Sequence, residues 1–478
     1  MTTGIKYIIA LILLPFAKPV LSQSRVAETE QNTTTLLAQT LTFEEYLGYV
    51  KKHHPLMKQA ELTLSIGEAN LLKARGGFDP KIEVDYDRKK FKNTEYYDQL
   101  SATFKIPTWY GIEFKANFEE NTGEFLNPNR TVPDGGLYSA GVSFSLAQGF
   151  LINERMASLK KARFFKEQTK ADRDVLVNTL LFEASKAYLE WLKATNEQLI
   201  YTTFLKNANT RLMAVERSVE TGEKAAIDIT EARITLQNRQ LNLEAASLKR
   251  KKAALIVSNY LWLNDIPMEV KEDVVPVVPE LNTLEASLLL EGITNTSGLL
   301  NNHPKLLSLD AKIEGLTVER SLKLNKLLPK INIQYNFLTP KIDQIHTFNT
   351  TNYKAFVNFS LPLFLRKARG DLRLANLKLQ DANLERVSTA ITLQNKIDAV
   401  YAEINSLTKQ NQLIRNIVID YEALVKAEER KFFLGESSLF IINSREQKLL
   451  DIQLKENILL IKRLMTTASL YNTLGLSV

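Results

Sequence analysis

Residues 180–194, with the sequence LLFEASKAYLEWLKA, decide how the rest of the chain can fold. Their small and apolar side chains follow the spacing of one helix face, namely Leu180, Ala184, Ala187, Trp191 and Ala194. The surrounding residues 150–219 contain neither Pro nor Gly. At about 1.5 Å per residue, these 70 or so residues predict roughly 105 Å of helix. A helix of that length needs packing partners along all of it, because propensity alone stabilises it little.

A second helix is expected to run back after a turn at Gly222 and to end near residue 262. It carries two apolar series with a seven-residue period, Leu241, Leu248 and Leu255 in one and Ile229, Leu236 and Leu243 in the other. The two series lie on different faces of the helix. Two apolar seams predict neighbours on two sides, as in a sheet or ring of helices.

The composition excludes several classes of site. The chain has 478 residues, 45% of them hydrophobic, and a formal net charge of +7. This charge is spread along the chain without a basic stripe and interleaved aromatic residues, so no nucleic-acid partner is expected. The sequence has no Cys, which excludes disulfides, thiolate metal sites and a Cys nucleophile.

The N-terminal region predicts export. Residues 1–22 place Lys6 before a short apolar run and end in small or neutral residues, which is typical of a secretory signal peptide. Residues 23–40 are polar and are expected to form a flexible tail. Thr42 and Glu45 then form a T-x-x-E capping box, so we expect a first helix from Thr42 to about Arg75.

After Pro80 the apolar residues recur at every second position, which predicts strands with one apolar and one polar face. The alternation covers Ile82, Val84 and Tyr86, and it recurs in residues 100–106, 112–118 and 142–146. Residues 121–136 are rich in Asn, Pro and Gly and are expected to form a surface loop.

An internal repeat organises the whole chain. The pairs His54-Pro55 and His303-Pro304 are separated by the same interval as Pro80 and Pro329. At the same interval, Ile331, Ile333 and Tyr335 match Ile82, Val84 and Tyr86. The second half also contains a long segment without Pro that turns at Gly435. We therefore expect a first repeat in residues 41–262, an equatorial connector in 263–300 and a second repeat in 301–478.

Alternating strands in an exported protein are found either in a soluble sandwich or in an outer-membrane barrel. One chain offers four to six strands, too few for a barrel with a water-filled lumen. Helices of about 100 Å cannot pack inside a domain of this size and must stand side by side. A cyclic oligomer would solve both problems, because the strands would close into one barrel and the helices into one tube.

The order of these features resembles the TolC-type outer-membrane efflux protein family. The start at Leu41-Thr42-Phe43-Glu44-Glu45 leading to His54-Pro55 is similar to that family's start, and so is Gly222 followed six residues later by Asp228. The resemblance implies a mainly helical protein in the outer membrane of a Gram-negative bacterium. It implies a homotrimer in which about four strands per chain form a twelve-strand transmembrane β-barrel and the helices form a periplasmic α-barrel.

The family also implies a function. Such a channel passively conducts substrates after docking with a periplasmic adaptor and an inner-membrane pump. We expect the helix-hairpin tips at Gly222 and Gly435 to contact the adaptor. The lipid-facing residues of the barrel are expected to be Ile82, Val84, Tyr86, Ile331, Ile333 and Tyr335.

Two features depart from the family pattern. The second tip has Ile441 six residues after Gly435, whereas the acids Asp228 and Glu231 follow the first tip. These two acids are either the pore constriction or ordinary solvated residues near a helix N-terminus. The additional segment 97–120 either adds strands to the barrel or forms an external hairpin.

Catalysis has little support, and we expect no enzyme activity, cofactor or metal site. His54 and His303 hold equivalent positions before Pro, which indicates a structural role. No phosphate-loop, G-x-S-x-G or H-E-x-x-H pattern occurs. The alternative to a channel is an exported coiled-coil structural protein or a surface-binding protein without a pore.

Overall fold

The structure, a computed structural model, describes residues 40–292, 300–347 and 349–476. All of them belong to one compact unit, Gln39–Val478. The expected signal peptide and residues 23–39 of the expected tail lie outside the described residues. Thr40, the last residue of that tail, is instead part of a short strand, β1 (Thr40–Leu41), which pairs in parallel with β8 (Val275–Pro276).

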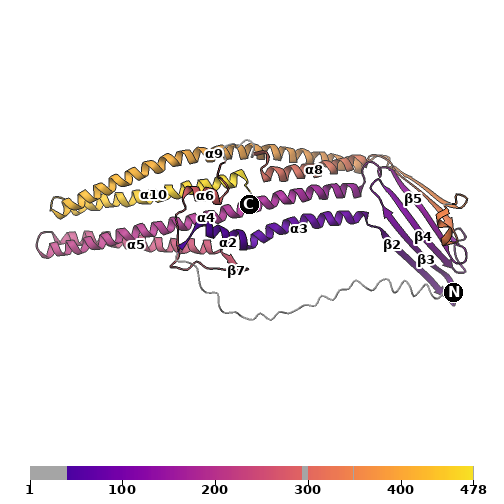
Figure 1. Ribbon diagram of the computed structural model, residues 1–478, viewed down its shortest axis with the longest axis horizontal. Helices are drawn as coiled ribbons and strands as arrows, with labels where there is room; N and C mark the ends of the chain where they lie inside the picture. The colour runs from indigo at the N-terminus through magenta and orange to yellow at the C-terminus, as the bar shows by residue number, and fades with distance from the viewer. Residues whose placement is uncertain (1–39, 293–299, 348, 477–478) are drawn as a thin grey trace. The chain divides into compact units, whose positions relative to one another are not determined.

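Most of the unit is helical (Figure 1). The α-helices are α2 (Phe43–His53), α3 (Pro55–Arg75), α4 (Glu154–Glu220), α5 (Ala226–Ser258), α6 (Leu281–Ser287), α8 (Pro304–Asn325), α9 (Arg366–Phe433) and α10 (Leu439–Leu474). Short 3-10 helices occupy η1 (Gly76–Phe78), η2 (Pro128–Arg130) and η3 (Ile342–Thr347). The two long helices, α4 with 67 residues and α9 with 68, confirm the expected length. Each is followed by a return helix after a tight turn.

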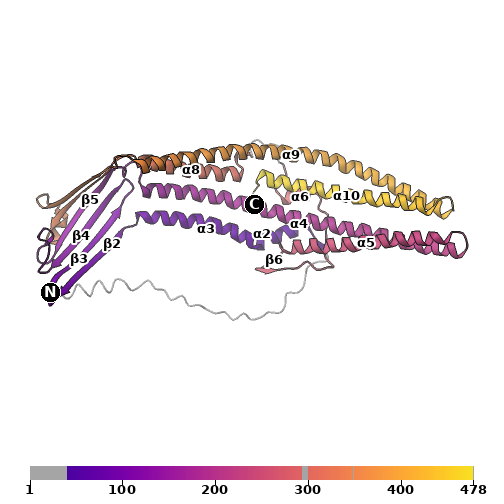
Figure 2. The same ribbon diagram turned by 180° about the vertical axis from the view of Figure 1, so that it is seen from behind.

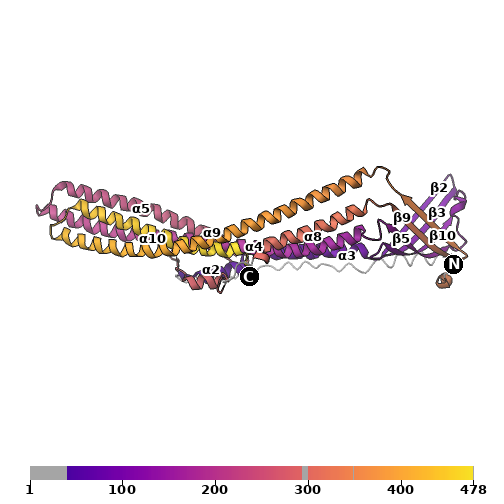
Figure 3. The same ribbon diagram turned by 90° about the horizontal axis from the view of Figure 1, so that it is seen from above.

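The long helices pack on several sides, as their apolar faces predict. The stripe Leu180, Ala184, Ala187, Trp191 and Ala194 is buried throughout. Helix α4 contacts α5 along one part of its length and α3 and α8 along another. Figure 2 shows α3 and α8 on either side of α4, and Figure 3 shows the hairpins α4–α5 and α9–α10 beside each other.

The expected first helix is divided into two. Helix α2 begins with the predicted capping box, since Thr42 accepts from the Glu45 amide and Glu45 bonds back to Thr42. It ends at His53, and His54 has extended backbone angles before α3 begins at Pro55. The single-helix prediction was wrong because a residue before Pro is disfavoured in the helical region and Pro lacks an amide hydrogen.

The main sheet has six strands in the order β10-β9-β5-β4-β3-β2. They are β2 (Lys81–Phe91), β3 (Thr94–Pro107), β4 (Ile112–Thr122), β5 (Leu137–Ala147), β9 (Lys330–Thr339) and β10 (Tyr353–Ser360). All neighbouring strands are antiparallel. The expectation of about four strands per chain is therefore corrected to six in this sheet. Segment 97–120 supplies most of β3 and β4, which lie inside the sheet rather than apart from it.

The described part of the segment between α5 and α8 packs against the helices. It contains the two-residue strands β6 (Trp262–Leu263) and β7 (Ile266–Pro267), which pair with each other, as well as β8 and α6. The buried Tyr188 hydroxyl of α4 lies 2.8 Å from the carbonyl oxygens of Leu41 and Val277 and accepts from the Val277 amide at 3.0 Å. Tyr188 also packs on Phe43 and Trp191, so the core is centred on this level of α4.

The two His-Pro pairs have the structural role that their position predicts. His54 Nδ1 accepts from the Leu56 amide, and His303 Nδ1 accepts from the Lys305 amide, each at 3.1 Å. Both residues are buried and both are the N-caps of helices that begin with Pro. Burial lowers the pKa of each imidazole, so the neutral form that accepts this bond is favoured.

Candidate functional site

Both hairpin tips have the same backbone geometry. Gly222 has φ = +82° and Gly435 has φ = +78°, in the left-handed region where a side chain is strained. The backbone amide of the residue after each Gly donates to a carbonyl in the last turn of the preceding helix. Glu223 donates to Ser218 and Glu436 donates to Lys431, each at 2.8 Å. These are the bonds of a Schellman motif, which ends a helix and turns the chain sharply.

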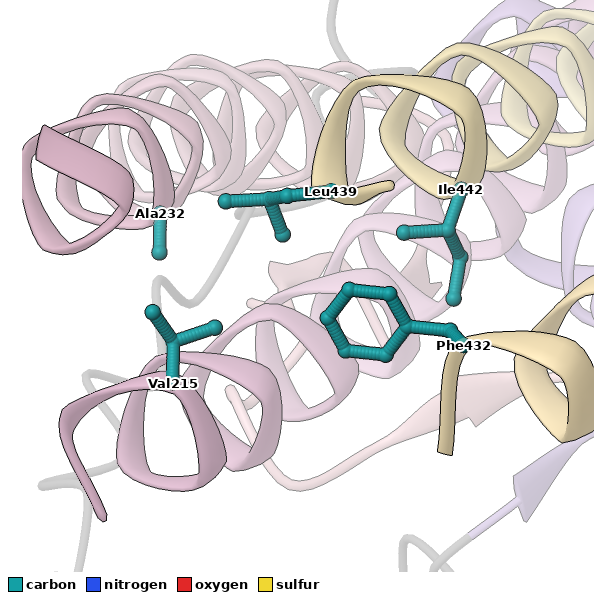
Figure 4. Close-up of a cluster of buried hydrophobic side chains, with 5 residues drawn as sticks. All are labelled: Val215, Ala232, Phe432, Leu439 and Ile442. Atoms are coloured by element: carbon teal, nitrogen blue, oxygen red, sulfur yellow. The ribbon is translucent and has the colours of Figure 1, made fainter. Parts of the chain in front are cut away.

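The tips are joined by a cluster of apolar side chains from all four hairpin helices (Figure 4). Val215 of α4 and Ala232 of α5 belong to the same cluster as Phe432 of α9 and Leu439 and Ile442 of α10. The ammonium group of Lys224, in the first turn, lies 3.7 Å from the centre of the Phe432 ring. The two hairpins of one chain therefore form one packed end rather than two independent arms.

Apolar side chains also point outward at this end. Ile227 follows the first tip, while Phe433, Leu434 and Phe440 flank the second. Each of these four side chains is between 67% and 74% exposed. Four large apolar residues around two neighbouring turns form a surface that another protein can cover.

The predicted acidic pair lies in the first turns of α5. Asp228 and Glu231 are both half-buried in the single chain. Glu231 contacts the second hairpin, because Asn443 Nδ2 of α10 donates to its Oε1 at 3.2 Å. The sequence did not predict this contact between residues of different hairpins.

A buried ion pair lies beside that contact. Arg211 of α4 binds both carboxylate oxygens of Glu446 of α10, at 2.7 and 3.1 Å. The side chains are only 8% and 1% exposed. Arg211 also donates to Asn443 Oδ1 at 3.2 Å, so Asn443 connects the ion pair to Glu231. Bidentate geometry makes this a strong link between the hairpins.

A third acid at the second tip was missed by the sequence analysis. Glu428 of α9 accepts from the Ser437 hydroxyl at 2.5 Å and from Arg445 Nε at 3.2 Å. The hydrogen bond from Ser437, supported by the charge of Arg445, lowers the pKa of Glu428 below its usual value. The sequence did contain a signal for this contact: Glu428 lies seven residues before Gly435 and Arg445 lies ten residues after it, on opposite sides of the predicted turn.

The six predicted lipid-facing residues share one face of the sheet. Ile82, Val84 and Tyr86 of β2 lie opposite residues of β3, and Ile331, Ile333 and Tyr335 of β9 lie opposite residues of β5 and β10. Successive cross-strand pairs extend this face over all six strands. It also contains Leu100, Ala102, Phe104, Ile106, Ile112, Phe114, Ala116, Phe118, Tyr138, Ala140, Val142, Phe144, Leu146, Phe337, Tyr353, Ala355, Val357 and Phe359.

The other face of the sheet is polar. Lys105 of β3 forms an ion pair with Glu83 of β2, and Thr103 donates to Asn117 Oδ1 at 2.9 Å. Lys115 of β4 reaches across β5 to donate to Gln334 Oε1 of β9 at 3.3 Å. The sheet is thus a single layer with one apolar and one hydrophilic surface.

Helix α5 presents a second uncovered apolar surface, which we call the α5 stripe. One of the two predicted seams, Ile229, Leu236 and Leu243, is half-buried within the chain, whereas the other is exposed. The α5 stripe extends this exposed seam with strict seven-residue spacing and comprises Ile227, Ile234, Leu241, Leu248 and Leu255. Its members are between 47% and 70% exposed.

The described residues lack two further features. Among residues 40–292, 300–347 and 349–476, no helix combines the length and apolarity that crossing a bilayer requires. Within the same ranges, no group of three His, Cys, Asp or Glu side chains is placed to hold a metal ion.

Comparison with known proteins agrees with this arrangement. The chain is 20% identical over 430 residues to the pyoverdine export outer membrane protein OpmQ of Pseudomonas putida, covering 88% of this chain and 78% of that protein. Its fold is similar to that of the Campylobacter jejuni CmeC outer membrane channel, with a TM-score of 0.65, 13% identity and coverage of 90% and 85%. It is also similar to the open state of the Neisseria gonorrhoeae MtrE outer membrane channel, with a TM-score of 0.65, 14% identity and 97% coverage of both chains.

The family profile described as outer membrane efflux protein matches residues 47–261 and 296–476, which is most of the chain. These two segments contain the helix hairpins and both parts of the sheet. The chain therefore belongs to the outer membrane efflux protein family and is an outer-membrane protein with a large periplasmic portion.

Proposed function

We propose that the protein is the outer-membrane channel of a tripartite efflux or secretion system and that it works as a homotrimer. The observation that carries this proposal is the pair of uncovered apolar surfaces, the sheet face and the α5 stripe. Soluble monomers rarely expose contiguous apolar surfaces of this extent. Lipid covers the sheet face, and a neighbouring copy covers the α5 stripe.

The proposed division of the chain follows from the order of its elements. Residues 41–262 and 301–478 form two structural repeats, joined by the equatorial connector 263–300. In support, each repeat contains a helix capped by His before Pro, then strands, a helix of nearly 70 residues, a Gly turn and a return helix. Two such repeats from each of three copies provide the walls of the periplasmic tunnel.

The channel conducts passively from the periplasm to the exterior. The polar sheet face lines the lumen, and its paired Lys and Glu side chains keep it hydrated. At the other end, Asp228 and Glu231 recur three times around the axis and form an acidic constriction. Acidic rings attract cations and make a narrow pore cation-selective.

The tips dock to a periplasmic adaptor, which connects the channel to an inner-membrane pump. The exposed Phe433, Leu434 and Phe440 around Gly435 support this assignment, because they provide an apolar contact surface on the packed end that both tips share. The variant Gly222→Val strains the turn without touching the sheet. We expect it to reduce transport and crosslinking to the adaptor while outer-membrane trimers still form.

Imaging of the detergent-purified protein tests the architecture. We expect a hollow cylinder that extends about 100 Å beyond the membrane thickness, as the long helices require. Heat-modifiable oligomers should be present in the outer-membrane fraction. A soluble, rod-shaped monomer would instead support an exported coiled-coil structural or surface-binding protein.

A further inference from the structure

The two edges of the sheet are open and run in opposite directions. Strand β2 forms one edge and β10 the other, and every residue of both is exposed. Because all five strand pairings between them are antiparallel, β2 and β10 point in opposite directions. The β10 edge of one copy can therefore pair with the β2 edge of the next and continue the antiparallel pattern.

The strands β2 and β3 continue both faces of the sheet without interruption. On the apolar face, Val84 lies opposite Ala102, which lies opposite Phe118. On the polar face, Glu83 lies opposite Thr103, which lies opposite Asn117. A hairpin standing outside the membrane in water would not need this apolar face, so the pattern places all six strands in lipid.

We propose that three copies close a barrel of eighteen strands, six from each chain, by pairing β10 of one copy with β2 of the next. This inference rests on the proposed trimer and goes beyond it, since the family resemblance implies only twelve strands. Barrel diameter grows roughly linearly with strand number, so the pore at the membrane is about half as wide again. Barrels of 16 to 18 strands leave an aqueous channel.

The pairings within the sheet allow a register between copies that gives this barrel an acceptable strand tilt. The residue paired with Lys81 lies on β3, and each paired residue has a partner on the next strand. Followed across all six strands, this series of partners ends at Lys354 on β10, six residues before Ser360. If Ser360 of one copy pairs with Lys81 of the next, the stagger is six residues for every six strands. A stagger of one residue, about 3.3 Å along the strand, for each strand spacing of about 4.8 Å corresponds to a strand tilt of about 35°. Transmembrane barrels have tilts of about 35–45°.

The same joint matches the side chains on both faces. With Ser360 opposite Lys81, Val357 lies opposite Val84 on the apolar face. On the polar face Asn358 lies opposite Glu83, and Lys354 lies opposite Asp87, so opposite charges meet across the joint. A shift by one residue would place apolar side chains against polar ones. Only shifts by an even number of residues preserve the two faces.

Disulfide crosslinking tests the joint, because the chain has no Cys of its own. The first variant carries Glu83→Cys and Asn358→Cys, and a second carries Glu83→Cys and Ser360→Cys to cover a shift of two residues. Five strand spacings separate β2 from β10 within one chain, about 24 Å. A bridge needs a Cα separation below about 7 Å, so any crosslink joins two copies. The variant Val84→Cys with Asn358→Cys places the thiols on opposite faces and is the control.

We expect one of the first two variants to give covalent dimers and trimers in outer membranes, and the control to give none. A variant with Asn117→Cys and Asn358→Cys tests a twelve-strand barrel, in which β4 would meet β10 of the next copy. Crosslinks in that variant alone, or intact trimers without any β2–β10 crosslink, would overturn the eighteen-strand barrel. An absence of trimers in every variant and in the unmodified protein would overturn the proposed function instead.

Discussion

The packed tip end and the sheet follow opposite rules of stabilisation. At the tip, apolar residues from four helices and the Arg211–Glu446 pair are buried within a single chain. In the sheet, β2 and β10 are exposed along their whole length, and the strands form a single layer. The chain therefore buries its tip network by itself but leaves both edges of its sheet uncovered.

This difference teaches where a mutation acts. A substitution in the buried tip network changes the stability of the single chain, because its partners lie in that chain. In the proposed barrel, a substitution on the sheet changes insertion into lipid or assembly with other copies. Variants in the two regions separate these two effects.

The largest effect is expected at the buried ion pair. Glu446→Ala removes the bidentate carboxylate from the buried Arg211 and leaves it only the more distant Glu429 at 3.7 Å, which costs about 3–5 kcal/mol. The free energy of unfolding, followed by helical circular dichroism in denaturant, measures the loss. Asp451→Ala, at an exposed position of the same helix, is the control and should change it little. Equal stability of both variants would show that the tip is not held by this pair.

A charge on the apolar sheet face should impair insertion. Tyr335→Lys places a charge on the proposed lipid face and is expected to cost about 2–4 kcal/mol at the bilayer midplane. Gln334→Lys, on the neighbouring residue, places the same charge on the polar face and is the control. Folding into lipid vesicles across a urea gradient measures both variants. If Gln334→Lys were the more damaging of the two, the assignment of the faces would be reversed.

The left-handed Gly residues predict a moderate backbone effect. An Ala side chain at Gly435 meets no atom within 4 Å, so Gly435→Ala costs only the strain of positive φ, about 1–2 kcal/mol. Gly315 in α8 is also free of contacts but lies in a helix without positive φ. Gly315→Ala should therefore stabilise by roughly 0.5–1 kcal/mol. Thermal unfolding of the two variants should shift in opposite directions, and shifts in one direction would contradict this explanation.

The two His caps predict a dependence on pH. Burial lowers the pKa of His54 and His303 in the folded chain, so the unfolded chain binds protons first as the pH falls. The neutral caps contribute their full stability above about pH 6.5, the pKa of an unperturbed His. This contribution declines as the pH falls below that value and through the lower pKa of the folded chain.

Thermal unfolding between pH 7.5 and 5.5 measures this decline. Asn is a good N-cap without a titrating group, so His54→Asn with His303→Asn should flatten the decline. An equally steep decline in this variant would assign the pH dependence to other groups.

The smallest effect concerns the acidic pair near the first tip. Asp228→Asn with Glu231→Gln removes two carboxylates per copy while keeping their size, and should reduce cation selectivity and block by multivalent cations. Single-channel recording measures both. Because Gln retains an oxygen for Asn443, the contact between the hairpins is preserved. Unchanged selectivity and block would mean that the constriction lies elsewhere.

The sequence predicted the long helices because their signals are local. The absence of Pro and Gly over residues 150–219, the apolar spacing around Trp191, and the turns at Gly222 and Gly435 all operate within a few residues. The break at His54 was missed because the apolar pattern continues across it, although the following Pro was a sufficient signal.

Features that depend on contacts distant in the sequence were not predicted. Glu231 and Asn443 are 212 residues apart, and nothing near either residue indicates the other. The position of residues 97–120 inside the sheet depends likewise on which strand pairs with which. Alternation fixes the face to which a side chain belongs, but it does not fix the order of the strands.

The strict period of the α5 stripe has a geometric consequence. Five apolar residues at seven-residue intervals, from Ile227 to Leu255, span four heptads of one helix. A straight α-helix has 3.6 residues per turn, so such a row drifts by about 20° per heptad around its surface. A neighbouring helix that covers the whole row must wind around α5 with a left-handed twist. In the proposed trimer, these five side chains thus encode the handedness of the joint between two copies.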